Sequence, residues 1–286
     1  MYKRILVGTD LSKTAQVATD RAASLAKRLG AELIVMHAGR DPGEPLKKLA
    51  EGYGAEAVVV EGHPADVLTA EADARGVDLL VVGSVGMTGA KRFLLGNVPN
   101  KVSHHTVTDL LIVKTDPPPK DMSDYSKILV GTDGSPTAMR AVDAAAKLAK
   151  SLDATVTVVC VYQPPSEQEL EKMRADPNDP VAQWHTSRST ADTPSEFRWR
   201  IAGASHAEDV LERAQEHASK QGVDAEVRAL EGHPAEVLLS LAEGEDFDVI
   251  AVGSVGMAGA KRMMLGNVPH RISHHAPTDV LILKTT

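Results

Sequence analysis

One long segment of this chain occurs twice. Residues Gly83–Pro99 return as Gly253–Pro269, and only positions 88, 93 and 94 differ from their counterparts. The earlier segment Ile5–Asp10 is likewise repeated as Ile128–Asp133. Because both motifs recur in the same order, the chain is expected to fold as two copies of one unit. A length of 286 residues is sufficient for two such domains, each with its own core.

A proline-rich stretch separates the two copies. Residues 117–119 are three consecutive prolines, which can neither continue a helix nor donate to a sheet. We therefore expect a first domain over residues 1–115, a semi-rigid linker over 116–126 and a second domain over 127–286. The second copy is longer between its second and third strands, which predicts an insertion at about 163–205. An amphipathic helix is expected to follow it, over His206–Gln221.

Short apolar runs alternate with segments of helical period in each half. Runs without polar alternation are typical of strands buried on both faces of a parallel sheet. A helix is predicted between the first two runs, beginning after Ser12 and ending at Gly30. This alternation predicts an α/β fold with two tandem Rossmann-like domains, each a doubly wound, five-stranded, mostly parallel sheet. The runs of the first half are Ile5–Val7, Leu33–Met36, Val58–Val60, Leu79–Val82 and Leu110–Val113.

The composition excludes several classes of protein. A content of 43% hydrophobic and 24% charged residues is typical of a globular protein. A net charge of −8 argues against nucleic-acid binding. No apolar run approaches the ~18 residues needed to cross a bilayer and no leader segment is visible, so we expect a cytoplasmic protein without a membrane partner. The single Cys160 lies in an apolar run, where a buried structural thiol is expected.

Small and acidic residues follow the first and fourth predicted strands. In a doubly wound sheet, ligands bind beyond the carboxyl ends of the strands, where the strand order reverses. The loops after Thr9 and Asp10 and after Gly83 and Ser84 should therefore border one crevice. The repeat predicts a second crevice of the same kind. Glycine amides without a Cβ can approach and bind an anion.

Other motifs fail on spacing or chemistry. Ala90 interrupts the Gly-Lys pair of a Walker loop, the glycines do not have dinucleotide spacing, and there is no Gly-x-Ser-x-Gly elbow. The pairs His104-His105 and His274-His275 repeat between the halves. Adjacent side chains on a helix diverge by about 100°, so these pairs are not expected to bind a metal. Capping of helix ends or pH-sensitive packing is the expected role.

The glycine spacing resembles that of a known family. Gly83, Gly86 and Gly96 follow the pattern Gly-x2-Gly-x9-Gly, and the second copy repeats it. This pattern resembles the ATP-binding branch of the universal stress protein family, in which tandem two-domain members are common. The resemblance covers nearly the whole chain. It implies one site per domain for ATP or another adenine nucleotide, with Mg²⁺ as an accompanying ion. The family has Ser or Thr after the third glycine, where this chain has Asn97 and Asn267.

The resemblance also implies which residues form each site. The base side would use Asp10 with the strand around Ala38, and Asp133 with the strand around Val161. The family pairs through its last strand, so Asp109–Lys114 and Asp279–Lys284 should meet each other in a pseudo-dimer or meet a second chain in a homodimer. The nucleotide-binding positions carried over are Thr9, Asp10, Ala38, Gly83, Ser84, Gly86, Gly96, Asn97, Val98, Thr132, Asp133, Val161, Gly253, Ser254, Gly256, Gly266, Asn267 and Val268.

Three functions remain open from the sequence. The resemblance implies a stress-response regulator in which bound ATP changes stability or partner affinity; its protein partner is not indicated. An ATP hydrolase or nucleotidyl-transfer enzyme would need a general base or metal-holding carboxylate, for which Asp10 and Asp133 are the candidates. A nucleotide-free scaffold would keep the glycines as turns and these aspartates as caps or Asx turns. No catalytic residue or protein-bound metal is assigned.

Overall fold

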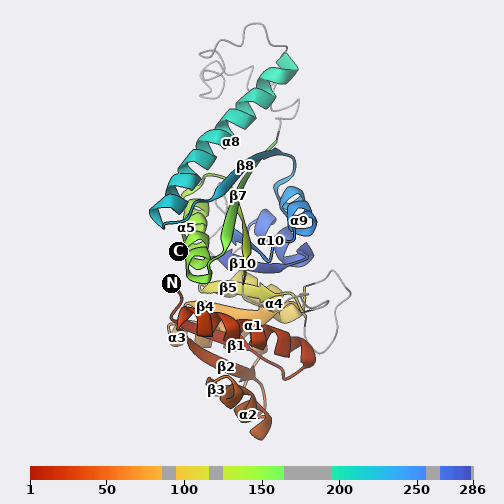
Figure 1. The fold of residues 1–286 in the computed structure, drawn as a ribbon. Helices are drawn as coiled ribbons and strands as arrows, with labels where there is room; N and C mark the ends of the chain where they lie inside the picture. Colours follow the sequence, from red (N-terminus) through yellow and green to blue (C-terminus); the bar gives the residue numbers. More distant parts are fainter. Residues whose placement is uncertain (86–94, 116–124, 164–194, 256–264, 285–286) are drawn as a thin grey trace.

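The chain folds as two α/β halves that share one sheet (Figure 1). A computed structural model describes residues 1–85, 95–115, 125–163, 195–255 and 265–284, with the backbone alone over 195–205. The first half contains β1 (Arg4–Gly8), α1 (Lys13–Leu29), β2 (Glu32–Ala38), α2 (Glu44–Gly52), β3 (Glu56–Val60), α3 (Pro64–Ala74), β4 (Leu79–Gly83), α4 (Asn97–His105) and β5 (Asp109–Val113). The second contains β6 (Lys127–Thr132), α5 (Pro136–Leu152), β7 (Thr155–Tyr162), α8 (Ser195–Lys220), β8 (Glu226–Glu231), α9 (Pro234–Gly244), β9 (Val249–Gly253), α10 (Asn267–His275) and β10 (Asp279–Leu283).

The sheet is two-fold symmetric in its strand order. Its ten strands run β3-β2-β1-β4-β5-β10-β9-β6-β7-β8, and the five strands of each half are parallel to one another. The halves join where β5 pairs with β10 in antiparallel fashion, with Leu111 opposite Leu281. The expected tandem Rossmann-like fold is confirmed, and the last strands meet each other within the chain. The strand order reverses between β1 and β4, and again between β6 and β9, which places a switch point in each half.

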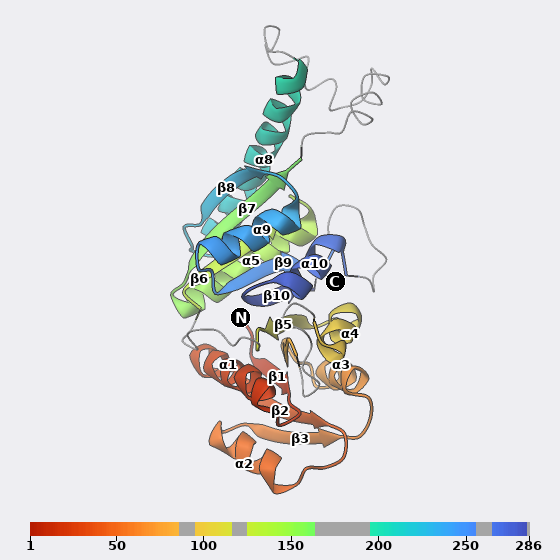
Figure 2. The same cartoon turned by 90° about the vertical axis from the view of Figure 1, so that its right-hand side faces the viewer.

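Two hydrophobic cores cover the two faces of this sheet. One core packs α1, α2, α5 and α8 on one face, and it contains Val142 of α5 and Val210 of α8. The other packs α3, α4, α9 and α10 on the opposite face, and it contains Val102 of α4 and Ile272 of α10 (Figures 1 and 2). The nearly continuous apolar strands are explained by this double coverage, because both of their faces are buried.

The first helix of each half begins and ends as its sequence indicates. The Ser12 hydroxyl accepts a hydrogen bond from Ala15 N at 3.1 Å, and the Ser135 hydroxyl accepts one from Ala138 N at 3.2 Å. The helix α1 ends at Gly30 in the left-handed region, with φ 63°. The helix α5 ends in the same conformation at Asp153, with φ 60°. Equivalent cap geometry is therefore reached with a different residue at the C-terminal end.

The helix α8 differs from expectation in its length. It begins at Ser195, within the predicted insertion, whereas the apolar periodicity predicts a start at His206. The N-terminal part of α8 stands out beyond the sheet in both views (Figures 1 and 2). Residues 164–194 and 116–124 lie outside the described ranges. The bounds proposed for the insertion, the linker and the domains therefore stay predictions.

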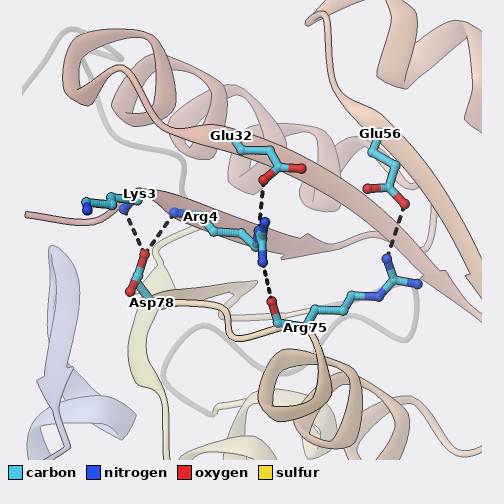
Figure 3. A network of polar contacts seen from close by, with 6 residues as sticks. All are labelled: Lys3, Arg4, Glu32, Glu56, Arg75 and Asp78. Carbon is cyan, nitrogen blue, oxygen red and sulfur yellow. Dashed lines mark hydrogen bonds and ion pairs between the residues drawn. The ribbon is translucent and has the colours of Figure 1, made fainter.

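A polar network ties the amino-terminal ends of the first-half strands together (Figure 3). The Asp78 carboxylate accepts hydrogen bonds from Lys3 N and Arg4 N at 2.8 and 2.9 Å, which fixes β1 beside the start of β4. The Arg4 guanidinium pairs with Glu32 at 2.8 Å and donates to Arg75 O at 2.5 Å. These charged groups lie at the opposite edge of the sheet from the predicted crevice, so we assign them a structural role.

Candidate functional site

The loops after the first and fourth strands of each half leave the sheet side by side. In the first half, β1 pairs in parallel with β4, from Ile5 opposite Leu79 onward, so their carboxyl ends face the same edge. In the second half a side chain joins the two loops directly. The Thr137 hydroxyl at the start of α5 donates to Val255 O after β9, at 3.0 Å. The two loops of the predicted crevice therefore leave the same edge of the sheet.

The third glycine of each motif packs on the backbone that follows the first glycine. Gly96 N donates to Ser84 O at 2.8 Å, and Gly266 N donates to Ser254 O at 2.8 Å. A Cβ on Gly96 would lie 3.3 Å from Ser84 O, and one on Gly266 would lie 3.5 Å from Ser254 O. A side chain at Gly96 would thus be tighter against this oxygen than most Cβ contacts, whereas the distance at Gly266 is an ordinary contact. The contact brings the start of α4, and of α10, against the glycine loop.

These two helices begin without a side-chain cap. Gly96 and Gly266 are the N-cap residues, and neither offers a side-chain acceptor to the first amides of the helix. The third helical residue is Pro99 or Pro269, which has no amide hydrogen. In the part of the chain that the structure describes, no acceptor contacts the amides of the two preceding residues, Asn97 and Val98 in the first half. A helix start of this kind binds anions through its amides and its dipole.

The serine after the first glycine has an internal partner in the first half. The Ser84 side chain is buried, its hydroxyl accepts a hydrogen bond from Thr115 N at 3.1 Å, and it lies 3.2 Å from the Thr115 hydroxyl. These contacts hold the loop to the chain that leaves β5. In the second half, Ser254 is also buried and its amide donates to Leu283 O at 2.9 Å. Each serine thus fixes the backbone directly after β4 or β9 to the chain that leaves the last strand of its half.

The strand-one aspartates form the turn that leads into the first helix. Ser12 N donates to the Asp10 carboxylate at 3.0 Å, and Ser135 N donates to the Asp133 carboxylate at 3.0 Å. Each aspartate therefore forms an Asx turn. This turn is compatible with a role in binding as well as with a purely structural role, because a carboxylate has about four acceptor positions. The turn holds each carboxylate at the carboxyl end of its strand.

The base side of the predicted site lies at the end of the second strand. Ala38 is the last residue of β2 and Val161 is next to last in β7. Thr9 N donates to Met36 O at 2.8 Å, which holds the exit of β1 against β2. His37 is not among the residues predicted for the site, yet its Nδ1 lies 2.9 Å from Thr9 O. Its position directly before Ala38, at the end of β2, is the one sequence feature that could have indicated it.

Cys160 takes the place of His37 in the second half. The ladder of β6 and β7 pairs Thr132 with Cys160. The thiol is buried, and burial together with the charge of Asp133 raises its pKa to about 11. A neutral thiol is a poor nucleophile, as expected for a structural cysteine. The two predicted sites therefore differ where the nucleotide base would lie, with His37 in the first half and Cys160 in the second.

Several predicted positions fall outside the described residues. Gly86 and Gly256 are the middle glycines of the two motifs, and the neighbouring basic pairs at 91–92 and 261–262 belong to the same segments. Across the ranges that the structure does describe, no group of three or more His, Cys, Asp or Glu side chains could hold a metal ion. No helix within those ranges is long and apolar enough to cross a bilayer.

The paired histidines gather where the two halves meet. The rings of His104 on α4 and His270 on α10 have centroids 5.7 Å apart, and His274 lies 4.5 Å from His270. His274 Nε2 is 3.2 Å from the Asn100 side-chain oxygen. Burial lowers the pKa of both His104 and His274, and the charge of His270 lowers them further. These histidines thus contribute to packing between α4 and α10.

Comparison with known proteins identifies the family. The model of the universal stress protein family matches residues 1–55, 44–114 and 124–284. The chain belongs to the universal stress protein family. The duplicated motifs and the paired switch points are therefore two copies of this family's domain, joined through β5 and β10.

Curated relatives match a little over half of the chain. The universal stress protein Rv1636 of Mycobacterium tuberculosis (strain H37Rv) is 33% identical over 166 residues, which is 58% of this chain and all of the relative. The universal stress protein YxiE of Bacillus subtilis is 32% identical over 162 residues, covering 56% of this chain and 99% of the relative.

Solved structures match the fold over nearly the full length. A universal stress protein from Archaeoglobus fulgidus has a TM-score of 0.63 at 19% identity, with 98% of each chain covered. A putative universal stress protein from Pseudomonas aeruginosa has a TM-score of 0.67 at 19% identity, covering 99% of this chain and 93% of the other. The two-half arrangement is therefore a known architecture of this family.

Proposed function

We propose that this universal stress protein is a stress-response regulator that binds an adenine nucleotide, ATP above all, in a site at each switch point. The observation that carries the proposal is the duplicated pairing of an uncapped helix start with a fixed carboxylate. In each half the helix that follows the glycine loop starts without a side-chain cap, and an Asx turn fixes the carboxylate of Asp10 or Asp133 at the exit of the first strand.

The chemistry of this arrangement suits a nucleotide. The amides at a helix start attract phosphate oxygens, and the glycine loop lets the phosphate approach the backbone. A carboxylate at the strand exit accepts a hydrogen bond from a ribose hydroxyl or an exocyclic amine. The exposed Asn97 and Asn267 side chains, which replace Ser or Thr of the family pattern, can still donate an N–H to a phosphate oxygen. Any Mg²⁺ would arrive with the nucleotide, since it needs few protein ligands.

Binding alone accounts for a regulatory role. A ligand that binds only the folded state stabilises it by mass action, by about 2.7 kcal/mol at a hundred times its dissociation constant. If the nucleotide binds one conformation of the protein more tightly than another, the difference in binding free energy can change the affinity for a protein partner in the same way. We place the protein in the cytoplasm and regard a further homodimer as part of this proposal.

Two measurements test the proposal. The first is chromatography of any nucleotide released when the purified protein is denatured. The second is the shift in melting temperature on adding ATP, ADP, AMP or cyclic AMP. We expect at least one nucleotide to be released or to stabilise the protein. An absence of both effects for all four nucleotides contradicts the proposal and favours a scaffold, whereas steady product formation from ATP favours an enzyme.

A pair of isosteric variants assigns the effect to the sites. Asn97→Asp and Asn267→Asp each place a negative charge beside the uncapped amides, which repels phosphate while the helix start tolerates an acidic residue. Each single variant should remove one binding site, and the double variant should remove both. Ser219→Asp adds the same charge at an exposed position of α8 and should leave binding unchanged.

A further inference from the structure

The two halves differ at the residue that follows the strand-one aspartate. Leu11 follows Asp10 with φ 62°, and Gly134 follows Asp133 with φ 79°. A Cβ on Gly134 would lie 2.6 Å from Val210 Cγ2 and 3.2 Å from Arg213 Nη2, both on α8. The space that a side chain occupies in the first half is thus taken by α8 in the second.

The helix α8 is fixed firmly in this position. It packs on α5, β7 and β8, and it buries Val210, Leu211 and Ala214 in the core shared with α5. The neighbouring Arg213 projects from the same turns, so its position relative to Gly134 is set by packing. Between its second and third strands the first half has only the short α2 (Glu44–Gly52), which contains no arginine, and the one arginine of this connection, Arg40, precedes α2 (Figure 1).

The guanidinium of Arg213 has no acidic partner in the part of the chain that the structure describes. Its one polar contact there runs from Nε to Asp209 O, at 3.3 Å. By contrast, Arg75, Arg228 and Arg271 each pair with a glutamate within 3.1 Å. Arg213 therefore brings uncommitted hydrogen-bond donors and a positive charge to the loop that carries Asp133.

The geometry points to Arg213 as a ligand-positioning residue of the second site alone. We infer that its guanidinium donates to oxygen atoms of the nucleotide bound beside Asp133, so that the second site binds more tightly than the first. The inference rests on the proposed function, because it assigns a specificity-determining residue to one of the two proposed sites. The phosphate sides of the sites are alike, since Gly96-Asn97-Val98 and Gly266-Asn267-Val268 are identical. The difference thus lies at the aspartate end of the crevice.

The test measures Arg213→Ala in proteins that keep one site each. Asn97→Asp leaves the second site, and Asn267→Asp leaves the first. Titration calorimetry with ATP should show a dissociation constant on the order of tenfold higher for Arg213→Ala when only the second site remains, as expected for the loss of a charge-assisted hydrogen bond. The same substitution should leave the dissociation constant unchanged when only the first site remains.

Controls separate a local effect from a loss of fold. Lys220→Ala removes a positive charge from the same helix, where Lys220 is exposed and 3.8 Å from Glu216, and it should not alter either dissociation constant. Arg213→Lys keeps the charge without the planar fork and should fall between arginine and alanine. The melting temperature without nucleotide checks that every variant folds.

The outcomes distinguish this inference from the proposed function. If the two sites bind ATP equally tightly, Arg213 does not have the inferred role. The same holds if Arg213→Ala leaves the dissociation constants unchanged, or raises them equally in both one-site proteins. In each of these cases the proposed function still stands. An absence of nucleotide binding by the unaltered protein overturns the proposed function itself.

Discussion

The guanidinium of Arg21 on α1 lies 3.1 Å from the carboxylate of Asp279 at the start of β10, and the two side chains are only 3% and 0% exposed. The same carboxylate accepts hydrogen bonds from Tyr125 OH at 2.7 Å and from Lys114 N at 2.8 Å. Because Arg21 and Lys114 belong to the first half and Asp279 to the second, this buried group joins the halves beside the β5–β10 seam. The pair also fixes which strand ends meet.

Asp279→Asn should destabilise the protein strongly. It replaces the buried carboxylate beside the Arg21 guanidinium with a neutral amide, and breaking a buried ion pair typically costs about 3 kcal/mol or more in the free energy of unfolding. Equilibrium unfolding in urea measures this loss. Asp109→Asn is the matched control, because Asp109 is the first residue of β5 and accepts from Lys284 N at 2.7 Å and Tyr2 OH at 3.0 Å while it stays partly exposed. Equal losses for the two variants would contradict the importance of the buried ion pair.

Asp153→Gly should stabilise the protein by about 0.5–1 kcal/mol. Asp153 ends α5 in the left-handed region at φ 60°, where a Cβ is unfavourable and glycine is not. Gly30 has φ 63° at the same position after α1, so Gly30→Asp is expected to destabilise by a similar amount. Both residues are exposed, which limits the effect to the backbone. Chemical denaturation of the two variants should give changes of opposite sign, and changes of the same sign would refute this explanation.

Acid should weaken the contact between α4 and α10. Burial, and then the charge of His270, lowers the pKa of His104 and His274 below the usual 6.5. Over the pH range between the folded and unfolded pKa values the unfolded chain binds more protons, so stability rises with pH there and is lost as the pH falls. His104→Gln with His274→Gln should flatten this dependence, measured as melting temperature from about pH 7 to 5. An unchanged slope in the double variant would exclude these histidines as its source.

Alkaline pH should affect stability through Lys284. Its ammonium donates to Ser103 O at 2.6 Å, and burial lowers the pKa of Lys284 to about 8 from 10.5. Between these values the unfolded chain holds the proton that the folded chain has lost, so this group makes the protein more stable as the pH rises. The difference in unfolding free energy between the unaltered protein and Lys284→Met should change across about pH 8 to 10.5. A difference that is independent of pH would show that Lys284 titrates normally when folded.

Much of the fold could be predicted from local signals. Ser12 and Ser135 indicated the starts of α1 and α5, because serine is a preferred N-cap residue whose hydroxyl can accept a hydrogen bond from the first amides of a helix. The apolar runs indicated the strands, since burial on both faces leaves no polar alternation. The glycine at position 96 indicated a close approach, and its Cβ position does lie near Ser84 O.

Other features of the site had no local signal. The position of His37 beside Thr9 O depends on how β2 lies against β1, and the position of Arg213 beside Gly134 depends on how α8 packs on α5. Such placements are set by contacts between distant segments, which periodicity does not encode.

The sequence by itself determined that two copies of one α/β unit exist and that each ends its first and fourth strands in residues suited to an anion and a nucleoside. This is so because glycine and cap residues act on the few residues next to them. Only the tertiary structure decided that the halves share one sheet through β5 and β10, and that α8 places the Arg213 guanidinium beside Gly134. These outcomes depend on packing between segments far apart in the chain, where small differences such as Leu11 against Gly134 make the two halves unlike.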